Sequence, residues 1–325
     1  VQWYRNGQKE VDGVYYRGNK HGEWNLWYEN GQLKEKGDFD MGKADGVYKF
    51  WYDNGHLKEE KSYKKGIKNG KWTWWYKHDH NLNFTDGNWS YNGTSYKAED
   101  GEELWKWWWY LNDNKEKEGY FTDGKRNGLW TWWYDTGLKK SEGSYLDDEQ
   151  DGLWLYYNPD ESIGEEITFL GGQKDGRSTT WLNPEEKSEE KFYRNGKLDG
   201  PSTFWENGFR SVMTSYKNDV PNGPWMIWYP NSDQIKEQGF HFDGLRDGLT
   251  VYYYKNGIKQ REGNYNAGYP ESVWSYWNAK SEKDFDFDFG VNLEHIDLKD
   301  LSEREKLFYK IGESNPFTGI ITQEN

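Results

Sequence analysis

Residues 22–46 read GEWNLWYENGQLKEKGDFDMGKADG, and this stretch decides the fold. It begins and ends with a glycine, 24 residues apart, and the pattern recurs along most of the chain. We number each copy from its first glycine as position 0, so that Trp24 lies at +2, Trp27 at +5, Tyr28 at +6 and Gly37 at +15. A fixed period of this length is typical of repeat proteins, whose copies stack to bury a common core.

The position-0 glycines define the copies. They recur every 24 residues within one residue, apart from one gap of 58, and are Gly22, Gly46, Gly70, Gly128, Gly152, Gly176, Gly200, Gly223 and Gly248. We interpret the gap as two periods plus ten inserted residues, with Leu104 at the missing position 0, and Ser272 starts a last copy. The sequence thus predicts about eleven copies over residues 1–280, with an insertion at about 78–103.

Each copy is expected to form a β-hairpin. Two strand-like runs flank Asn30-Gly31, and Asn-Gly is favoured in type I′ turns because both central residues need a positive φ. A second tight turn, with glycines four apart as in residues 42–46, leads into the next hairpin. A single hairpin is marginal in water, so the copies must stack edge to edge. The expected fold is all-β, an elongated antiparallel sheet or solenoid of stacked hairpins.

The alternation of side chains along strands assigns two faces to the sheet. Positions +2, +4, +6, +15 and +17 share one face, which carries Trp24, Leu26, Tyr28 and Phe39 in the first full copy. The glycine at +15 lies opposite the aromatic residue at +2, so that a ring can cover its bare backbone. We expect this face to be the core.

The other face is polar at +3 but aromatic at +5. Because equivalent rings lie two strands apart, roughly 10 Å, another side chain must lie between them, and we expect lysines at +12 (Lys34, Lys58, Lys140). These rings either pack in a tightly coiled sheet or line a groove that binds sugars or a partner's side chains. Tyr157 and Tyr253 occupy +5 in two copies, and the candidate tryptophan ladder is Trp27, Trp51, Trp75, Trp109, Trp133, Trp181, Trp205, Trp228 and Trp277.

Composition and motifs argue against several functions. A net charge of −14 argues against a nucleic-acid partner, and no apolar run is long enough to span a bilayer. The chain has no cysteine, no phosphate-binding glycine loop and no nucleophile motif. His78 and His80 are close together but lack an evident set of further ligands. We therefore expect no catalytic residue, metal or cofactor.

The repeat pattern resembles the MORN-repeat variant family, whose bacterial members are often labelled YwqK-type antitoxins. The clearest matches are residues 21–39, 127–145 and 247–265, and the resemblance covers about residues 1–278. It implies stacked antiparallel hairpins and a role in interaction rather than catalysis. The copies at Gly152, Gly176 and Gly200 depart from it, because each lacks the aromatic residue at +2 or at +6.

Residues 281–325 have a different character. The run KDFDFDFG (283–290) alternates phenylalanine with aspartate and predicts a strand, and residues 293–310 are expected to form a helix before an extended tail. Val1 falls at position +3 of an incomplete first hairpin, and the tail could supply the missing half-strand to a second molecule. The candidate assembly residues are Trp3, Tyr4, Pro316, Phe317, Thr318, Gly319, Ile320 and Ile321.

These features favour a non-enzymatic scaffold that assembles head to tail into a filament, outside the cell or at its surface rather than in the cytoplasm. The alternative is a module that binds a protein or a glycan through the tryptophan ladder, as an antitoxin or immunity protein would bind its partner.

Overall fold

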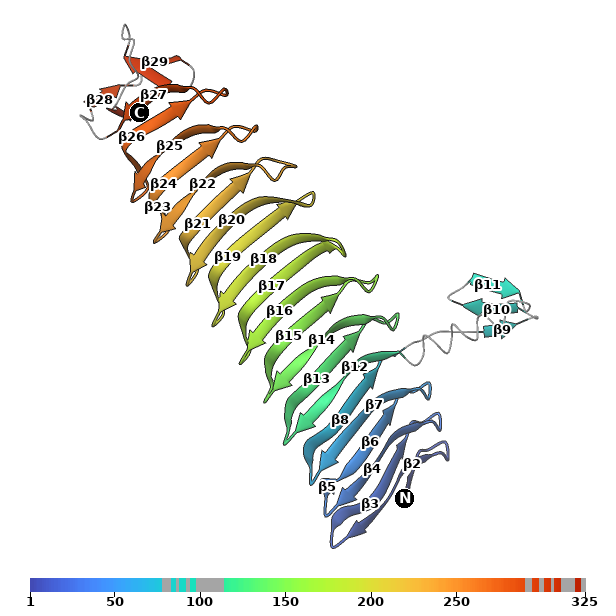
Figure 1. Ribbon diagram of the computed structural model, residues 1–325. Helices are drawn as coiled ribbons and strands as arrows, with labels where there is room; N and C mark the ends of the chain where they lie inside the picture. The colour runs from blue at the N-terminus through green and yellow to red at the C-terminus, as the bar shows by residue number, and fades with distance from the viewer. Residues whose placement is uncertain are drawn as a thin grey trace. The chain divides into compact units, whose positions relative to one another are not determined.

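The structure is a computed structural model that describes residues 1–77 and 114–289 in full, together with the backbone of seven short strands elsewhere. The chain divides into two compact units, Val1–Gln173 and Lys174–Asn325. All the secondary structure that the structure describes is β (Figure 1). This confirms the all-β prediction.

The first unit is a series of antiparallel strands that pair in chain order. These strands are β1 (Gln2–Trp3), β2 (Lys9–Tyr16), β3 (Asn19–Trp27), β4 (Leu33–Asp40), β5 (Lys43–Ala44), β6 (Gly46–Trp51), β7 (Leu57–Lys64), β8 (Ile67–Trp75), β12 (Lys115–Thr122), β13 (Lys125–Trp133), β14 (Lys139–Leu146), β15 (Glu149–Tyr157) and β16 (Ile163–Leu170).

The second unit repeats this arrangement. Its strands are β17 (Gln173–Asn183), β18 (Glu186–Arg194), β19 (Lys197–Glu206), β20 (Phe209–Lys217), β21 (Val220–Trp228), β22 (Ile235–Phe242), β23 (Leu245–Arg246), β24 (Gly248–Tyr253), β25 (Lys259–Asn266), β26 (Tyr269–Trp277) and β27 (Lys283–Asp288). Across both units, 24 strands run antiparallel to their neighbours, as the repeat predicts.

The two turns of each repeat differ from the prediction. In the hairpin at Asn30-Gly31 only Gly31 has a positive φ (85°), and its N–H donates to the carbonyl of Tyr28 (2.9 Å). This is a type I turn followed by a bulge, in place of the expected type I′ turn. The type I′ pairs lie at positions +19 and +20, where Met41 (φ 47°) and Gly42 (φ 81°) join β4 to β5. Asn207-Gly208 alone among the predicted Asn-Gly pairs has two positive φ angles.

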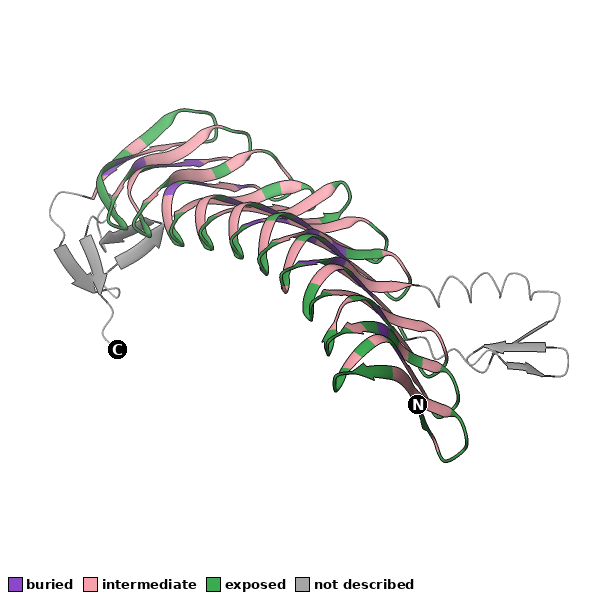
Figure 2. Ribbon diagram, turned by 90° about the horizontal axis from the view of Figure 1, so that it is seen from below, coloured by how far each residue is buried: buried purple, intermediate pink, exposed green. Residues whose placement is uncertain are grey.

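The predicted core face is confirmed by burial at +2. In all ten copies that the structure describes, the +2 side chain is at most 6% exposed, and buried segments recur from copy to copy within each unit (Figure 2). Trp72, Phe121 and Trp130 form one core cluster in the first unit, and Trp154, Ile167 and Phe169 form another. The ten +2 residues are Trp24, Tyr48, Trp72, Trp130, Trp154, Ser178, Ser202, Trp225, Thr250 and Trp274.

The +2 ring covers a glycine, but the glycine belongs to the preceding copy. A Cβ on Gly37 would lie 2.4 Å from the ring of Tyr48, and a Cβ on Gly143 would lie 2.2 Å from that of Trp154. Trp24 is the backbone partner of Gly37, as predicted, yet its own ring lies over Gly13. The ring at +2 therefore leans back across one strand and joins successive copies.

The region between β8 and β12 also differs from the prediction. β8 pairs directly with β12, so that Trp72 and Gly119 are partners. The copy expected at Leu104 therefore does not stand between these strands in the sheet. Within the intervening residues the structure describes a small antiparallel sheet of β9 (Asn83–Thr85), β10 (Asn88–Tyr91) and β11 (Thr94–Lys97).

The helix predicted at residues 293–310 is wrong. The structure has three strands there, β28 (Glu294–Asp297), β29 (Leu301–Arg304) and β30 (Leu307–Lys310), and β29 pairs with β30. Ser302 and Glu305 have the spacing of a helix capping box, but Ser302 lies within β29. A strand at the predicted tail, β31 (Gly319–Thr322), pairs in parallel with β28.

Candidate functional site

The +5 aromatic residues lie opposite position +11 because of a bulge in each hairpin. The strand register shifts between +4 and +5, and Trp27 pairs with Leu33 rather than with Lys34. The same shift pairs Trp133 with Lys139 and Trp277 with Lys283. This single extra residue moves the +12 side chain away from the +5 rings.

A cation at +11 lies against the +5 ring in several copies. The Lys9 ammonium is 5.9 Å from the ring centroid of Trp3 and 5.6 Å from that of Trp27. In the second unit Lys187 lies between Trp181 (5.5 Å) and Trp205 (5.7 Å). These distances suit cation–π contacts of about 0.5–1 kcal/mol each at partly exposed sites. Further contacts of this kind join Lys115 to Trp133, Lys139 to Tyr157, Arg210 to Trp228 and Lys259 to Trp277.

The lysines expected between the tryptophans lie elsewhere. Lys34 is 5.5 Å from the ring of Tyr28, and Lys58 is 5.7 Å from that of Tyr52. Lys140 stands in the same relation to Tyr134. The prediction of a cation between equivalent rings is thus correct in kind but wrong by one position.

In several copies a carboxylate at +14 forms an ion pair with the cation at +11. Lys139 Nζ lies 2.9 Å from Glu142 Oε2, and the hydroxyl of Tyr157 donates to Glu142 Oε1 (2.6 Å). Burial and this hydrogen bond raise the pKa of Tyr157 to about 12. Burial alone would raise the pKa of Glu142, but the hydrogen bonds from Tyr157 and Lys139 outweigh it and lower the pKa. Five more copies pair +11 with +14: Lys9–Asp12, Lys115–Glu118, Lys187–Glu190, Lys259–Glu262 and Lys283–Asp286.

The sheet face that carries these groups is partly exposed to solvent. The +5 rings that the structure describes are half-buried, except Trp3, which is 58% exposed, and Trp228, which is 7% exposed. Thr73 and Thr131 at +3 are buried as well, at 4% and 8%. Trp109 lies outside the described residues. We call the +5 rings with their +11 and +14 partners the tryptophan ladder of each unit.

Sequence reasoning missed a series of tyrosine hydrogen bonds. The hydroxyl at +6 donates to the backbone carbonyl of the +5 residue in the next copy, as from Tyr28 to Trp51 (2.9 Å) and from Tyr76 to Trp133 (2.8 Å). The recurrence of tyrosine at +6 was the available signal. The same bond is made by Tyr4, Tyr52, Tyr134, Tyr229 and Tyr254.

The structure describes only some of the candidate assembly residues. Trp3 is 58% exposed, whereas the hydroxyl of Tyr4 is bonded to the carbonyl of Trp27 (2.8 Å). Residues 316–318 lie outside the described residues. Gly319, Ile320 and Ile321 pair with β28 of their own chain. The tail strand is therefore paired within its own chain.

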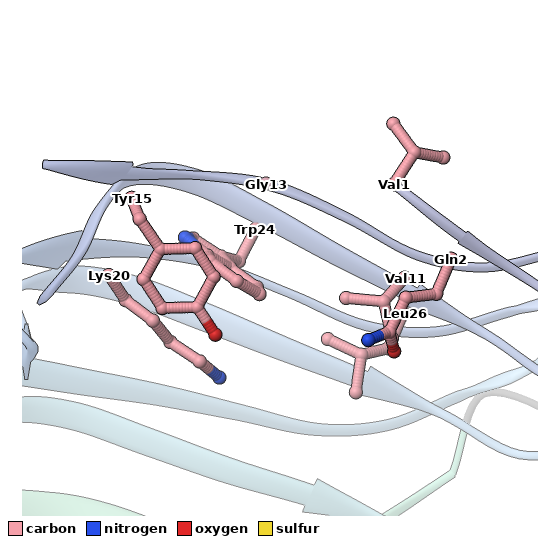
Figure 3. A pocket seen from close by; sticks show the side chains of 8 residues that line it. All are labelled: Val1, Gln2, Val11, Gly13, Tyr15, Lys20, Trp24 and Leu26. Atoms are coloured by element: carbon pink, nitrogen blue, oxygen red, sulfur yellow. The ribbon is translucent and has the colours of Figure 1, made fainter. Parts of the chain in front are cut away.

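A hollow beside β1 is lined by the aromatic face of the first hairpins. Tyr15 and Lys20 lie by the ring of Trp24, at 5.0 and 4.4 Å, while Val11 and Leu26 line its other end (Figure 3). The lining holds no carboxylate and no histidine.

No cluster of three metal-ligating side chains occurs in the described part of the chain, and His78 and His80 fall outside it. Within that part, no helix has the length and apolar character needed to cross a bilayer.

The comparisons with known proteins agree with this geometry. The sequence model of the MORN repeat variant matches residues 20–41, 44–65 and 246–267. Each match runs from two residues before position 0 to the +19 turn. No curated protein matches the chain. The chain thus carries repeats of the MORN repeat variant family, in both units.

Proposed function

We propose that the chain is a non-enzymatic scaffold that binds a partner protein along the tryptophan ladder. The observation that carries this proposal is the recurrence of one half-exposed arrangement, a +5 ring with a +11 cation and a +14 carboxylate, at intervals of roughly 10 Å. A row of such groups offers a partner apolar surface, charge and hydrogen-bonding atoms at a fixed spacing. MORN repeats are generally interaction modules, which supports the same conclusion.

Peptide selection tests the proposal. A displayed peptide library is selected on the purified protein, and the affinity of each recovered peptide is measured against Trp133→Ala and Lys139→Ala. We expect losses of about tenfold or more, as for buried aromatic and charged contacts at interfaces. Leu153→Ser is the control, because Leu153 is exposed (54%) and is not part of the ladder. Equal loss with Leu153→Ser, or none with the ladder variants, would contradict the proposal.

A glycan is a second possible occupant of the same rings, because tryptophan faces also stack on sugars. Titration with oligosaccharides while recording tryptophan fluorescence separates the two. Quenching at millimolar sugar that disappears in Trp133→Ala would favour a glycan as the ligand. Unchanged emission would exclude a glycan.

Head-to-tail assembly is the second candidate function. The exposed side chains of Val14 (66%) and Tyr15 (63%) on β2, with Trp3 on β1, offer apolar surface that supports it. Because β31 pairs within its own chain, a strand exchange would first have to break that pairing. Sedimentation velocity over a range of concentrations measures assembly, with Tyr15→Lys and deletion of residues 312–325 as variants. A protein that stays monomeric at high concentration would exclude the filament.

A further inference from the structure

Two arginines surround one tyrosine on the aromatic face of the second unit. Arg246 on β23 donates from Nη1 to the hydroxyl of Tyr252 on β24, at 2.8 Å. Arg261 on β25 lies over the face of the same ring, 3.9 Å from its centroid. Both guanidinium groups are therefore held in place by Tyr252, one at its tip and one on its face.

The two arginines have few negatively charged partners. Glu237 Oε2 lies 3.5 Å from Arg246 Nη2, which is a long contact for an ion pair. Arg261 forms no ion pair with any residue in the described part of the chain. In a protein with a net charge of −14, this local excess of positive charge is unusual. Arg246 retains 34% exposure of its side chain, so solvent reaches the group.

The first unit contains a matched arrangement in which the arginine is satisfied. Arg126 lies 3.9 Å from the ring centroid of Tyr145, the same distance as Arg261 from Tyr252. Arg126 Nε donates to Asp148 Oδ1 and Nη2 to the backbone oxygen of Asp148, both at 3.1 Å. A stacked guanidinium thus keeps its in-plane N–H groups available for oxygen acceptors, and Asp148 accepts them here.

Unpartnered polar atoms gather around the two arginines. Six buried side-chain nitrogen and oxygen atoms in the described residues lack a hydrogen-bond partner, and four of them lie in this region. A buried polar group without a partner costs about 1–3 kcal/mol, so these atoms are available to hydrogen-bond a ligand or water that enters the region. The four atoms are Trp225 Nε1, His241 Nδ1, Thr250 Oγ1 and Arg261 Nε.

The surrounding contacts place these groups together. His241 and Trp225 have ring centroids 5.6 Å apart, and Arg246 lies 4.4 Å from the ring of Trp225. Burial, and then the charge of Arg246, lower the pKa of His241, which agrees with a positive local field. Tyr276 and Phe285 stack at 4.5 Å beyond Tyr252 and Arg261 and extend the aromatic surface.

We propose that Arg261 and Arg246 bind a carboxylate of a partner protein segment in which an acidic residue is flanked by apolar side chains. Arg261 Nε has no hydrogen-bond partner and can donate to a carboxylate oxygen, and Arg246 adds a second guanidinium group beside it. The aromatic surface beside them suits the apolar flanks. The net charge of −14 repels long polyanions, which favours a segment with one or two carboxylates over a nucleic acid. This site lies on the aromatic core face and is independent of the tryptophan ladder.

The experiment follows the arginine side chains directly. The full chain is labelled with ¹⁵N-arginine, and the Nε–Hε resonances are recorded while the capped peptide Ser-Phe-Glu-Phe-Ser is added. The matched peptide Ser-Phe-Gln-Phe-Ser and inorganic phosphate are the comparison probes. We expect the Glu peptide to shift the resonances of Arg261 and Arg246 and to leave that of Arg126 unchanged.

Arginine variants test whether Arg261 and Arg246 themselves bind the Glu peptide. Arg261→Gln and Arg246→Gln should each weaken binding of the Glu peptide by roughly tenfold or more, since hydrogen bonds to charged groups are strong. Arg261→Lys should retain part of the affinity, and Arg126→Gln should change nothing. Thermal unfolding of each variant checks that the fold is retained.

Three outcomes would contradict the proposal. Equal shifts with the Gln peptide would show that charge plays no part, and equal binding of phosphate would assign the site to small anions. An equal loss in Arg126→Gln would show that binding is a general property of the sheet. Any of these results would overturn the proposal.

Discussion

The indole N–H of Trp154 donates a hydrogen bond to the backbone carbonyl of Ser144, ten residues earlier, at 3.1 Å. To reach it, the ring crosses the backbone of Gly143, where a Cβ would lie 2.2 Å from the ring atoms. The same bond is made by Trp24, Trp72, Trp130 and Trp274 to the carbonyls of Val14, Ser62, Tyr120 and Asn264. In these five copies one buried ring therefore packs and hydrogen-bonds the copy to the preceding one.

Gly143→Ala tests this contact. Gly143 does not have a positive φ, so alanine adds no backbone strain, and the added methyl group acts only by displacing the ring of Trp154. We expect a loss of about 1–3 kcal/mol in the free energy of unfolding, as for overpacked cores, measured by denaturant titration. Ser144→Ala is the control, because only its backbone oxygen takes part. A neutral Gly143→Ala would show that the ring is free to move aside.

Thr214→Gly is the reverse experiment. Thr214 pairs with Trp225 at a place where several other copies have glycine, as at Gly143, and Trp225 lies against Gly239 instead, with its Nε1 unpartnered. Removing the side chain of Thr214 should let the ring lean back and donate to the carbonyl of Ser215. The indole N–H of Trp225 should then gain protection from hydrogen exchange, followed by ¹⁵N–¹H spectra. Unchanged exchange would mean that Thr214 does not hold the ring in its present place.

The repeat, the faces and the pairing of +2 with the glycine at +15 were predictable because they follow from periodicity alone. That each ring covers the glycine of the preceding copy was not, because periodicity does not say which way a side chain leans. The position of the lysines was not, because one bulged residue per hairpin shifts the register after +4, and Asn30-Gly31 is compatible with both turn types. The helix at 293–310 failed for a related reason. A short run with scattered leucines carries no period long enough to separate helix from strand.

Tyr134→Phe tests the +6 hydrogen bonds. Its hydroxyl donates to the carbonyl of Tyr157 at 2.8 Å, and phenylalanine keeps the ring but removes the donor. We expect a loss of about 0.5–1.5 kcal/mol in the free energy of unfolding. Tyr269→Phe, at a 77% exposed position, should be neutral. Equal effects of the two changes would show that the bond does not join the copies.

Glu142 should make stability depend on pH in the acid range. Its pKa lies below the ordinary value of 4.5, so the folded state binds its proton less readily than the unfolded chain does. The stabilisation is therefore complete above the ordinary pKa and is lost as the pH falls through the lowered, folded-state value. In Glu142→Gln the decline in unfolding free energy from about pH 5 to about pH 3 should be shallower. The exposed Glu29→Gln should follow the wild type, and a parallel decline in Glu142→Gln would contradict the assignment.

Trp133→Ala distinguishes packing from binding in the tryptophan ladder. Trp133 is half-buried beside Lys115 (5.5 Å), whereas Trp130, three residues earlier, is 3% exposed on the core face. Trp130→Ala should lower the free energy of unfolding by about 3–5 kcal/mol, as large core truncations do. Because only part of the Trp133 ring is removed from water, its loss should cost about half as much.

Thr73→Ala is the stability reference for substitutions on the face that carries the tryptophan ladder. Thr73 is 4% exposed and its hydroxyl donates to Glu118 Oε2 at 3.3 Å, so its loss should cost about 1 kcal/mol. If Trp133→Ala destabilises the protein as much as Trp130→Ala does, the ring serves the sheet alone, and the ladder has no free surface for a partner. If its effect lies between those of Thr73→Ala and Trp130→Ala while peptide binding is lost, the exposed half of the ring is the part that binds.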